Sequence, residues 1–251
     1  MNKTILITGA TSGIGLACAK KFAAAKNNLI LTGRRKDRLD EIKASLQNEF
    51  GIQVTSLCFD VQKKTAVDAA FKTLETTAID ILVNNAGLAL GRDAFDEADM
   101  TDWETMMQTN VNGLLYVTRA ALPFLKRSAS PHIVNLGSIA GKEVYEFGNV
   151  YCASKFAVDA LSRSMRIDLL KHGIKVTAIH PGAVETEFAL VRFKGNQEKA
   201  GATYKGLVPL TPADIADTIH YCCSLPPHVC INELIITCLQ QAGTYYFNKN
   251  E

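Results

Sequence analysis

A short apolar run followed by a glycine-rich turn, close to the start of the chain, limits the folds available to it. The run at residues 3–8 is rich in β-branched and aliphatic residues, which predicts a strand buried on both faces. It leads into Thr8-Gly9-Ala10-Thr11-Ser12-Gly13-Ile14-Gly15, and an Ala-rich helical stretch follows to about Lys26. Glycines let the backbone approach a pyrophosphate, whose charge then faces the free N–H groups at the helix start. We therefore expect Gly9, Thr11, Ser12, Gly13, Ile14 and Gly15 to bind a dinucleotide, although the spacing G-x-x-x-G-x-G differs from the common fingerprint.

The alternation of buried strands and amphipathic helices continues to the end of the chain. Strands are predicted at 28–32, 53–58, 79–83, 132–136, 175–180 and 234–237, and helices at 37–49, 100–125, around Tyr151 and at 212–224. This pattern predicts an α/β fold of the Rossmann type. It would be a doubly wound parallel sheet of about seven strands with helices on both faces. Residues 1–251 contain no repeat or linker, so we expect a single domain.

Composition excludes several classes of partner. Hydrophobic residues make up 47 % of the chain and charged residues 21 %, which is typical of a folded globular protein. The formal charge of +2 gives no electrostatic reason to expect nucleic acid. The apolar runs are shorter than the roughly 18 residues of a membrane helix, and the first strand leaves no room for a signal peptide, so we expect a cytoplasmic protein. The seven cysteines form no C-x-x-C pair, so we expect them to be reduced and expect no metal.

Two arginines follow the second predicted strand, where a dinucleotide fold that binds NAD places an acidic residue. Here the position carries Gly33, with Arg34 and Arg35 behind it. Arginine forks match a phosphate bidentately, so the pattern indicates the 2′-phosphate of NADP. The alternative is a solvated basic turn before the next helix. Asp60, after the third strand, either accepts a hydrogen bond from the adenine or caps the following helix.

A tyrosine and a lysine four residues apart, Tyr151 and Lys155, share one face of a predicted helix. A free phenol has a pKa of about 10, and a neighbouring ammonium favours the phenolate. The pair is therefore suited to exchange a proton with an alcohol or carbonyl oxygen near neutral pH. The structural alternative is a half-buried Tyr beside a Lys that extends to water.

Further polar residues follow predicted strands or interrupt a predicted helix. Ser138 follows the fifth strand, where open α/β sheets bind ligands, and is either a turn residue or a donor to the substrate oxygen. Asn110 lies inside a predicted helix, where it is either a tolerated polar group or a residue that perturbs the helix and orders a water. Asn84-Asn85-Ala86-Gly87 follow the fourth strand, where short amides and a glycine can fix the turn while leaving the backbone open to the cofactor ribose. For Asn84, a purely structural role is at least as well supported. About 25 residues at 186–210 show weak periodicity, which predicts a lid over the site.

Taken together, these motifs resemble the short-chain dehydrogenase/reductase family over essentially the whole chain. The resemblance is carried by Thr8…Gly15, Asn84-Asn85-Ala86-Gly87, Asn110, Ser138, Tyr151, Lys155 and Pro181-Gly182, which have the family's order and spacing. Four further segments resemble the NADP-dependent 3-hydroxy acid dehydrogenases, whose substrates are serine, allo-threonine and related acids. They are Leu88-Ala89-Leu90-Gly91, Asp102-Trp103-Glu104-Thr105-Met106, Val191-Arg192-Phe193-Lys194-Gly195 and Leu210-Thr211-Pro212. Glu185 departs from that subgroup, which often carries extra glycine there.

The resemblance implies a role for each matching residue. Tyr151 would donate and accept the proton, Lys155 would lower its pKa and bind the nicotinamide ribose, Ser138 would orient the reacting oxygen, and Asn110 would hold a water that links Lys155 to solvent. Outside the glycine turn, the residues expected to contact NADP are Arg34, Arg35, Asp60, Val61, Asn85, Tyr151, Lys155, Pro181, Gly182, Val184 and Thr186.

The substrate and the assembly state are less constrained. A 3-hydroxy acid carries an anion that needs a bidentate partner, so we expect Arg192 in the lid to bind it, with Lys194 as the weaker candidate and a solvated loop charge as the alternative. Other readings of the chain are a general carbonyl or 3-oxoacyl-thioester reductase, and a non-catalytic NADP sensor. The resemblance also implies a homotetramer, at whose interface the aromatic tail Tyr245-Tyr246-Phe247 could pack.

Overall fold

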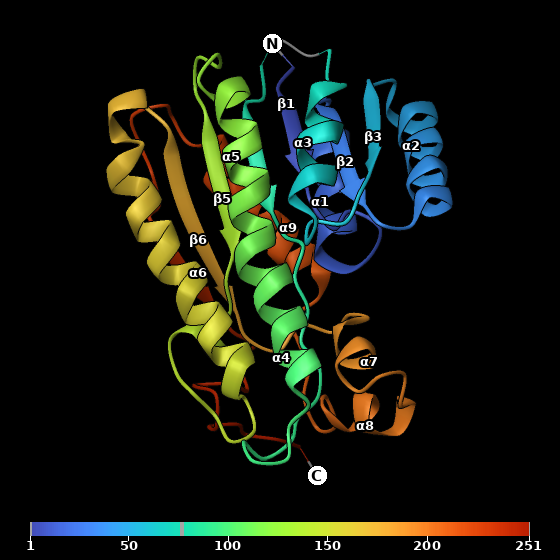
Figure 1. Ribbon diagram of the computed structural model, residues 1–251, viewed down its shortest axis with the longest axis vertical. Helices are drawn as coiled ribbons and strands as arrows, with labels where there is room; N and C mark the ends of the chain where they lie inside the picture. Colours follow the sequence, from blue (N-terminus) through green and yellow to red (C-terminus); the bar gives the residue numbers. More distant parts are fainter. Residues whose placement is uncertain (1, 76–77, 251) are drawn as a thin grey trace.

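A parallel sheet runs through the centre of the computed structural model, which describes residues 2–75 and 78–250 (Figure 1). Its strand order is β3-β2-β1-β4-β5-β6-β7, and each neighbouring pair is parallel. The strands are β1 (Thr4–Ile7), β2 (Asn28–Gly33), β3 (Val54–Cys58), β4 (Ile81–Asn84), β5 (His132–Leu136), β6 (Lys175–Pro181) and β7 (Glu233–Ile236). The predicted doubly wound sheet of seven strands is confirmed. Its order reverses between β1 and β4, so the carboxyl ends of these strands open a crevice there.

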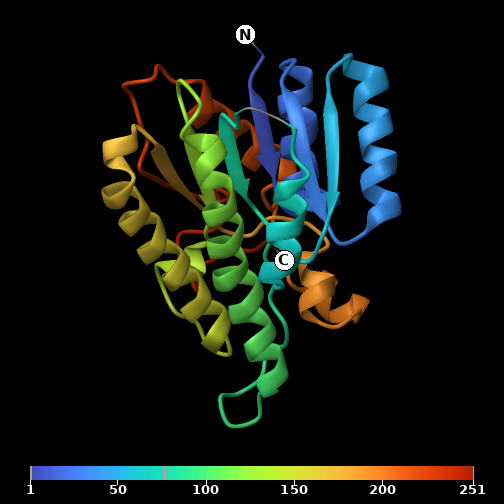
Figure 2. The same ribbon diagram turned by 45° about the horizontal axis from the view of Figure 1, so that its top comes forward.

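Helices cover both faces of the sheet. The longer ones are α1 (Gly13–Ala24), α2 (Lys36–Phe50), α3 (Lys64–Lys72), α4 (Met100–Met107), α5 (Leu114–Leu125), α6 (Asn149–Asp168) and α9 (Pro212–Ser224). Shorter segments are η1 (Gln108–Gly113), η2 (Ile139–Gly141), η3 (Leu170–His172), α7 (Phe188–Arg192) and α8 (Gln197–Ala202). In Figure 1, α3, α5 and α6 lie in front of the sheet, and α1 and α9 lie behind it. Figure 2 shows α2 along the outer edge of β3, with the orange lid helices beyond the ends of the strands.

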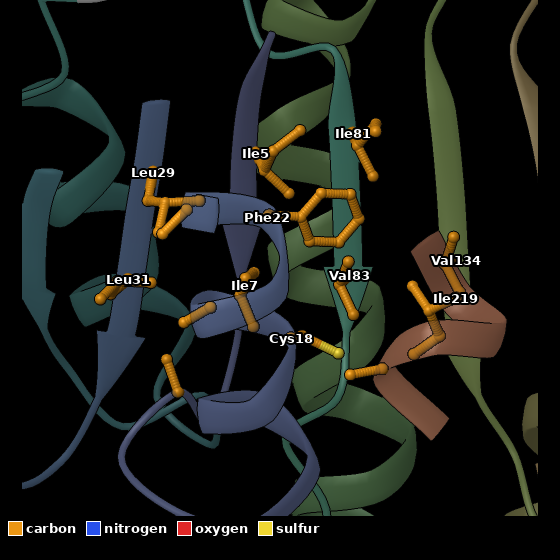
Figure 3. Close-up of a cluster of buried hydrophobic side chains, with 14 of the residues drawn as sticks. Ile5, Ile7, Cys18, Phe22, Leu29, Leu31, Ile81, Val83, Val134 and Ile219 are labelled. Atoms are coloured by element: carbon orange, nitrogen blue, oxygen red, sulfur yellow. The ribbon is translucent and has the colours of Figure 1, made fainter. Parts of the chain in front are cut away.

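Alternation along each strand sends side chains into two separate cores. In β1, Ile5 and Ile7 face α1, α2 and α9, whereas Leu6 faces α3 and α5. Phe22 of α1 reaches over the β1 and β4 side chains and contributes the largest ring of the first core (Figure 3). A sheet that is apolar on both faces explains why its strands are continuous aliphatic runs.

The long helix predicted at 100–125 is interrupted. Between α4 and α5, η1 is a π-helical segment that contains Asn110, so the helical axis continues while the backbone bonding widens. Gly113, the last residue of η1, lies so close to Val61 that a Cβ on it would be 2.8 Å from a Val61 methyl group. The predicted perturbation of the helix at Asn110 is therefore present, as a widened turn.

Three other expectations can be compared with the structure. The segment 186–210 contains two short helices, α7 and α8, where the sequence suggested only weak order. All seven cysteines are free, as expected, although Cys58 is exposed. Within residues 2–75 and 78–250, we find no helix with the length and apolar character needed to cross a membrane.

Phe22 tests the core between α1 and the sheet. Its side chain is 2 % exposed, so Phe22→Ala removes a buried ring and leaves a cavity. We expect a loss of about 3–5 kcal/mol in the free energy of unfolding, measured by urea denaturation. Lys20→Ala, on the exposed face of the same helix, should change it by no more than about 0.5 kcal/mol. Equal effects of the two substitutions would contradict this placement of α1.

Candidate active site

A cavity of about 730 Å³ opens at the carboxyl ends of the strands. It is lined by the glycine turn after β1, the segments that follow β2, β3, β4, β5 and β6, the lid, and the C-terminal tail (residues 239–250). This is the place where open α/β sheets bind ligands, and the volume is in the range of small-molecule and cofactor sites.

The glycine turn is packed so tightly that side chains are excluded from it. Gly9 and Gly13 have φ angles of +64° and +51°, in the left-handed region that favours glycine. A Cβ on Gly15 would overlap the Gly9 carbonyl oxygen and lie 2.5 Å from Asn85 Nδ2. That Asn85 amide donates to the carbonyl oxygens of Thr8, at 2.8 Å, and Gly9, at 3.2 Å. Asn85 therefore holds the turn in shape from β4.

The start of α1 faces the same cavity. Ser12 occupies the N-cap position, yet its side chain makes no capping hydrogen bond. The first N–H groups of this 12-residue helix are therefore left for another acceptor, and the dipole favours an anionic one. Ser12, Gly13 and Ile14 all line the cavity, so the turn fits a pyrophosphate.

Both arginines after β2 line the cavity as well. Arg35 donates through Nε and Nη2 to Thr11 Oγ1, at 3.2 and 2.9 Å, and its Nη1 lies 3.5 Å from Glu187 of the lid. Arg34 lies 3.9 Å from Asp60 and is 62 % exposed, which leaves its guanidinium accessible. Asp60 accepts from the Gln62 backbone N–H at 3.0 Å, and α3 begins only at Lys64, so the alternative that Asp60 caps that helix is wrong.

The other cofactor-binding candidates also gather around this cavity. Val61, Pro181, Gly182, Val184 and Thr186 all line it. Gly182 packs against Gln241 so closely that a Cβ would overlap the amide oxygen of Gln241. The same oxygen accepts from the Ala183 N–H at 2.8 Å, so the tail shapes this part of the wall.

Ser138, Tyr151 and Lys155 meet deeper in the cavity. Ser138 follows β5 and caps η2, its Oγ accepting from the Ala140 N–H at 3.1 Å. Tyr151 and Lys155 lie one turn apart on α6 and are both buried. Lys155 Nζ lies 5.9 Å from the centre of the Tyr151 ring and donates to the Leu136 carbonyl at 2.9 Å. The interpretation of Lys155 as a solvated lysine is therefore wrong.

Burial dominates the proton affinities of this pair. Desolvation raises the pKa of the Tyr151 phenol well above its usual range, and nearby Tyr145 adds to the rise, while Ser138 and Arg192 oppose it. Burial also lowers the pKa of Lys155 to about 8. Lys155 does not produce the expected lowering of the phenol pKa, because the desolvation of the phenolate outweighs the nearby charges and hydrogen bonds that favour it.

Asn110 connects the widened helix to this centre. Its Nδ2 donates to the Leu88 carbonyl at 2.8 Å and to Ser154 Oγ at 3.0 Å, and its Oδ1 accepts from the Leu88 N–H at 2.8 Å. The side chain therefore clamps the segment after β4 to α6. Asn84, by contrast, is buried and bonds Thr118 and Asn135 at 2.9 Å each, as a structural residue.

The lid brings Arg192 over Tyr151. The Arg192 guanidinium carbon lies 5.5 Å from the centre of the Tyr151 ring and 5.5 Å from that of Tyr145. Nη1 donates to the Tyr145 hydroxyl at 2.8 Å, and Nε donates to the Gly91 carbonyl at 3.2 Å. Among the described residues, no carboxylate lies within 4.0 Å of this guanidinium.

Lys194 has a different environment. Its Nζ lies 2.8 Å from Asp102 and 4.0 Å from Asp99, and its side chain is 57 % exposed. It therefore ties the lid to α4, outside the cavity wall, and of the two candidate cations Arg192 is the one that faces the phenol.

Several cavity residues escaped the sequence analysis. Tyr145 lies in an irregular segment with no motif, and Arg92, whose guanidinium carbon lies 5.9 Å from the centre of the Tyr145 ring, directly follows the segment Leu88–Gly91 that was used only for the resemblance. The tail residues Thr244, Tyr245 and Phe247 also line the cavity, because the tail folds back on its own chain. Thr244 donates to Glu143 at 2.9 Å, and the Tyr245 hydroxyl contacts the Glu146 N–H. The aromatic residues of the tail are the signal in the sequence for this packing, and their packing at a subunit interface stays a prediction.

Comparison with known proteins agrees with this geometry. Residues 3–197 match the family model for short chain dehydrogenase. Sulfoacetaldehyde reductase from Chromohalobacter salexigens is 45 % identical over 249 residues, 98 % of each chain. The NADP-dependent 3-hydroxy acid dehydrogenase YdfG from Escherichia coli (strain K12) is 44 % identical over 92 % of each chain. The closed form of a serine dehydrogenase complexed with NADP+ superposes with a TM-score of 0.91 at 41 % identity, covering 99 % of this chain and 100 % of the other.

The buried lysine makes stability depend on pH. With a pKa of about 8 in the folded protein against 10.5 as its ordinary value, the unfolded chain binds more protons between these limits. The free energy of unfolding of the wild type, relative to Lys155→Met, should therefore rise between about pH 8 and pH 9.5, by up to about 1.4 kcal/mol per pH unit. Urea denaturation at several pH values measures this difference. Lys20→Met changes an exposed lysine and keeps Lys155, so its free energy of unfolding relative to Lys155→Met should rise with pH in the same way. A difference between the wild type and Lys155→Met that does not change with pH would contradict the burial of Lys155.

Proposed function

Because this chain belongs to the short-chain dehydrogenase family, we propose that it exchanges hydride between NADP and the 3-hydroxyl carbon of a short 3-hydroxy acid. Substrates of this class are serine, allo-threonine and 3-hydroxypropionate. The family and the cavity make the protein an oxidoreductase that acts on CH–OH groups. The observation that supports a 3-hydroxy acid as the substrate is the position of Arg192 over Tyr151.

The cofactor proposal is supported by the fit of the cavity wall. The pyrophosphate would be held by the glycine turn and the start of α1, and the 2′-phosphate by Arg34 and Arg35. Two of the similar proteins described above are named for NADP or hold it. When bound, NADP supplies the hydride transfer itself. The protein supplies position and the proton, and positioning can contribute as much as about 7–11 kcal/mol.

Tyr151 is the proton-exchanging group of this proposal. Because burial raises its pKa, the phenol carries its proton near neutral pH and is ready to donate to a carbonyl oxygen in reduction. The Ser138 hydroxyl would hold the same oxygen in place. Lys155, with a pKa of about 8, can give or take a proton near neutral pH. Asn110 holds the neighbouring Leu88 and Ser154 and would order the water that links Lys155 to solvent.

Arg192 and Tyr145 would select the anion. The guanidinium presents a planar fork that matches a carboxylate, and no described carboxylate competes for it. The Tyr145 hydroxyl accepts from Arg192, so its own proton is free to donate to the same anion. The anion would then lie beside the phenol, which suits a substrate with few carbons between its acid group and its hydroxyl.

Reduction of a sulfonated aldehyde is a second candidate function. The relative from Chromohalobacter salexigens is named for it, and the cluster of Arg192 and Tyr145 offers donors to more than one oxygen, as a sulfonate requires. The general carbonyl or 3-oxoacyl-thioester reductase makes less use of Arg192. A non-catalytic NADP sensor would not require Ser138, Tyr151 and Lys155 to converge.

A substrate panel separates these functions. Oxidation of serine and 3-hydroxypropionate, and reduction of sulfoacetaldehyde and an acetoacetyl thioester, would be followed at the nicotinamide absorbance with both NADP and NAD. We expect the 3-hydroxy acids with NADP to give the highest kcat/KM. The homotetramer and the cytoplasmic location stay predictions.

Tyr151→Phe should remove turnover while NADPH binding persists. The substitution deletes the proton that the carbonyl oxygen needs and keeps the ring that packs 5.6 Å from Phe188. We expect kcat to fall by about 10²–10⁴-fold, with the Kd for NADPH, measured by fluorescence, within about twofold. A parallel collapse of cofactor affinity would show that Tyr151 is mainly structural.

Arg192→Met should discriminate against anionic substrates. Loss of a charge-assisted pair is worth about 1.5–3 kcal/mol, so kcat/KM for 3-hydroxypropionate should fall roughly 10–100-fold, while that for a neutral ketone changes little. Lys194→Met is the matched control in the same lid and should leave both ratios close to wild type. If Arg192→Met lowers kcat/KM equally for the acid and for the neutral ketone, Arg192 does not bind the substrate carboxylate.

A further inference from the structure

A buried histidine lies directly behind the Ser138 backbone. His180 of β6 is 0 % exposed, and its Nδ1 lies 3.3 Å from the Ser138 carbonyl oxygen. The imidazole occupies the space that a side chain on Gly137 would need, since a Cβ there would overlap Nδ1 and lie 2.7 Å from Cε1. The ring therefore packs against Gly137 and lies beside the Ser138 carbonyl.

Charged side chains form a network of ion pairs on the Nε2 side of the His180 ring. His180 Nε2 lies 3.6 Å from Asp159 Oδ1, and Lys142 Nζ lies 2.9 Å from the same oxygen and 2.5 Å from Glu233. Arg163 also contacts both carboxylates, at 3.0 and 3.5 Å. Asp159 is one turn past Lys155 on α6, so the network joins the helix of Tyr151 and Lys155 to β6, β7 and the end of η2.

This network already contains its cation. Asp159, His180 and Glu233 could in principle hold a metal ion, but the Lys142 ammonium lies within salt-bridge distance of both carboxylates. Burial and the charge of Lys142 lower the pKa of His180, which makes the neutral ring the form near pH 7. In the tautomer that carries its proton on Nδ1, the ring donates to the Ser138 carbonyl, while Nε2 has no hydrogen-bond partner among the described residues.

We propose that His180 is a positioning residue that sets the place of the Ser138 hydroxyl relative to the Tyr151 phenol. The Ser138 carbonyl, which belongs to the peptide that joins Ser138 to Ile139, also accepts from the Gly141 N–H at 2.8 Å, so the His180 contact supplies a second anchor for that peptide. Without it the peptide can rotate, and the Ser138 side chain moves with it. The inference rests on the proposed function, in which Ser138 holds the reacting oxygen while Tyr151 exchanges its proton.

A second buried histidine provides a matched control. His132 of β5 is 2 % exposed and contacts Thr177 Oγ1 at 2.7 Å. It begins β5, whereas Ser138 follows the end of that strand, so His132 is distant from the cavity along the strand. Replacing it removes a comparable buried ring without touching the Ser138 segment.

The test is a double-mutant cycle with steady-state kinetics, using NADP and 3-hydroxypropionate or, if that is not oxidised, the best substrate of the panel above. His180→Leu fills the site without a donor and should lower kcat by about 10-fold or more, with KM for NADP within about twofold. His180→Asn can place its amide N–H near the position of Nδ1 and should restore kcat to within about threefold of wild type. His132→Leu should lower the unfolding midpoint and leave kcat unchanged.

The cycle with Ser138→Ala identifies the route of the effect. If His180 acts through Ser138, His180→Leu should cost less than about twofold in kcat in the Ser138→Ala background. If the losses in kcat of His180→Leu and Ser138→Ala multiply fully in the double variant, the proposal is overturned. A His180→Asn variant with a kcat as low as that of His180→Leu would also overturn it. If His180→Leu does not fold, His180→Gln replaces it, because its amide reaches toward Asp159 instead of Ser138.

A structural readout separates this inference from the proposed function. Crystal structures of the wild type and the His180 variant should differ in the distance from Ser138 Oγ to the Tyr151 hydroxyl. An unchanged distance overturns the positioning role, whatever the substrate. Full turnover by Ser138→Ala and Tyr151→Phe would instead overturn the proposed function on which the role rests.

Discussion

The Lys155 ammonium, buried and bonded to the Leu136 carbonyl at 2.9 Å, joins α6 to the sheet. A charged amine in a protein interior is costly unless its N–H groups reach acceptors, and burial accordingly lowers its pKa to about 8. Leu136 is the last residue of β5, so this contact sets the position of α6 relative to the strand end. Gly87 completes the fit, since a Cβ there would lie 3.6 Å from Nζ and 3.2 Å from Asn110 Oδ1. Tyr151, one turn earlier on α6, is directed into the cavity as a result.

The electrostatics of the site favour a protonated phenol beside a partner that titrates near neutral pH. Desolvation outweighs every nearby charge on Tyr151, and the charges that favour its phenolate come from Arg192 rather than from Lys155 in the protein alone. This arrangement suits proton donation, and it also gives Arg192 an influence on the phenol in addition to its proposed contact with substrate. An anion bound at Arg192 would reduce that influence, so substrate binding and the proton affinity of Tyr151 are coupled.

Local patterns in the sequence predicted the elements that depend on local physics. Aliphatic runs marked the strands, and the positive φ angles of Gly9 and Gly13 are what the glycine turn requires. The missed features depend on contacts between distant segments. The local perturbation of the helix at Asn110 was predicted, but its hydrogen-bond partners Leu88 and Ser154 were not, because they lie on other segments. The burial that controls the pKa of Tyr151 likewise depends on segments remote from the Tyr-Lys pair. The return of the tail over the cavity likewise depends on a few contacts, such as Thr244 to Glu143.

A continuous set of contacts links the proton-exchanging centre to the proposed anion site. Asn110 holds both Ser154 of α6 and Leu88, and three residues further on Gly91 exchanges two hydrogen bonds with Arg192, from its N–H at 2.9 Å and to its carbonyl at 3.2 Å. The separation between the Tyr151 phenol and the Arg192 guanidinium is therefore set by the segment 88–91 rather than by the lid alone. Because that segment is fixed at Leu88 by the buried Asn110 amide, an acid group bound at Arg192 would restrict substrates to one length between the hydroxyl and the acid group. Substrate length would then be selected by the same π-helical turn that supports the catalytic helix.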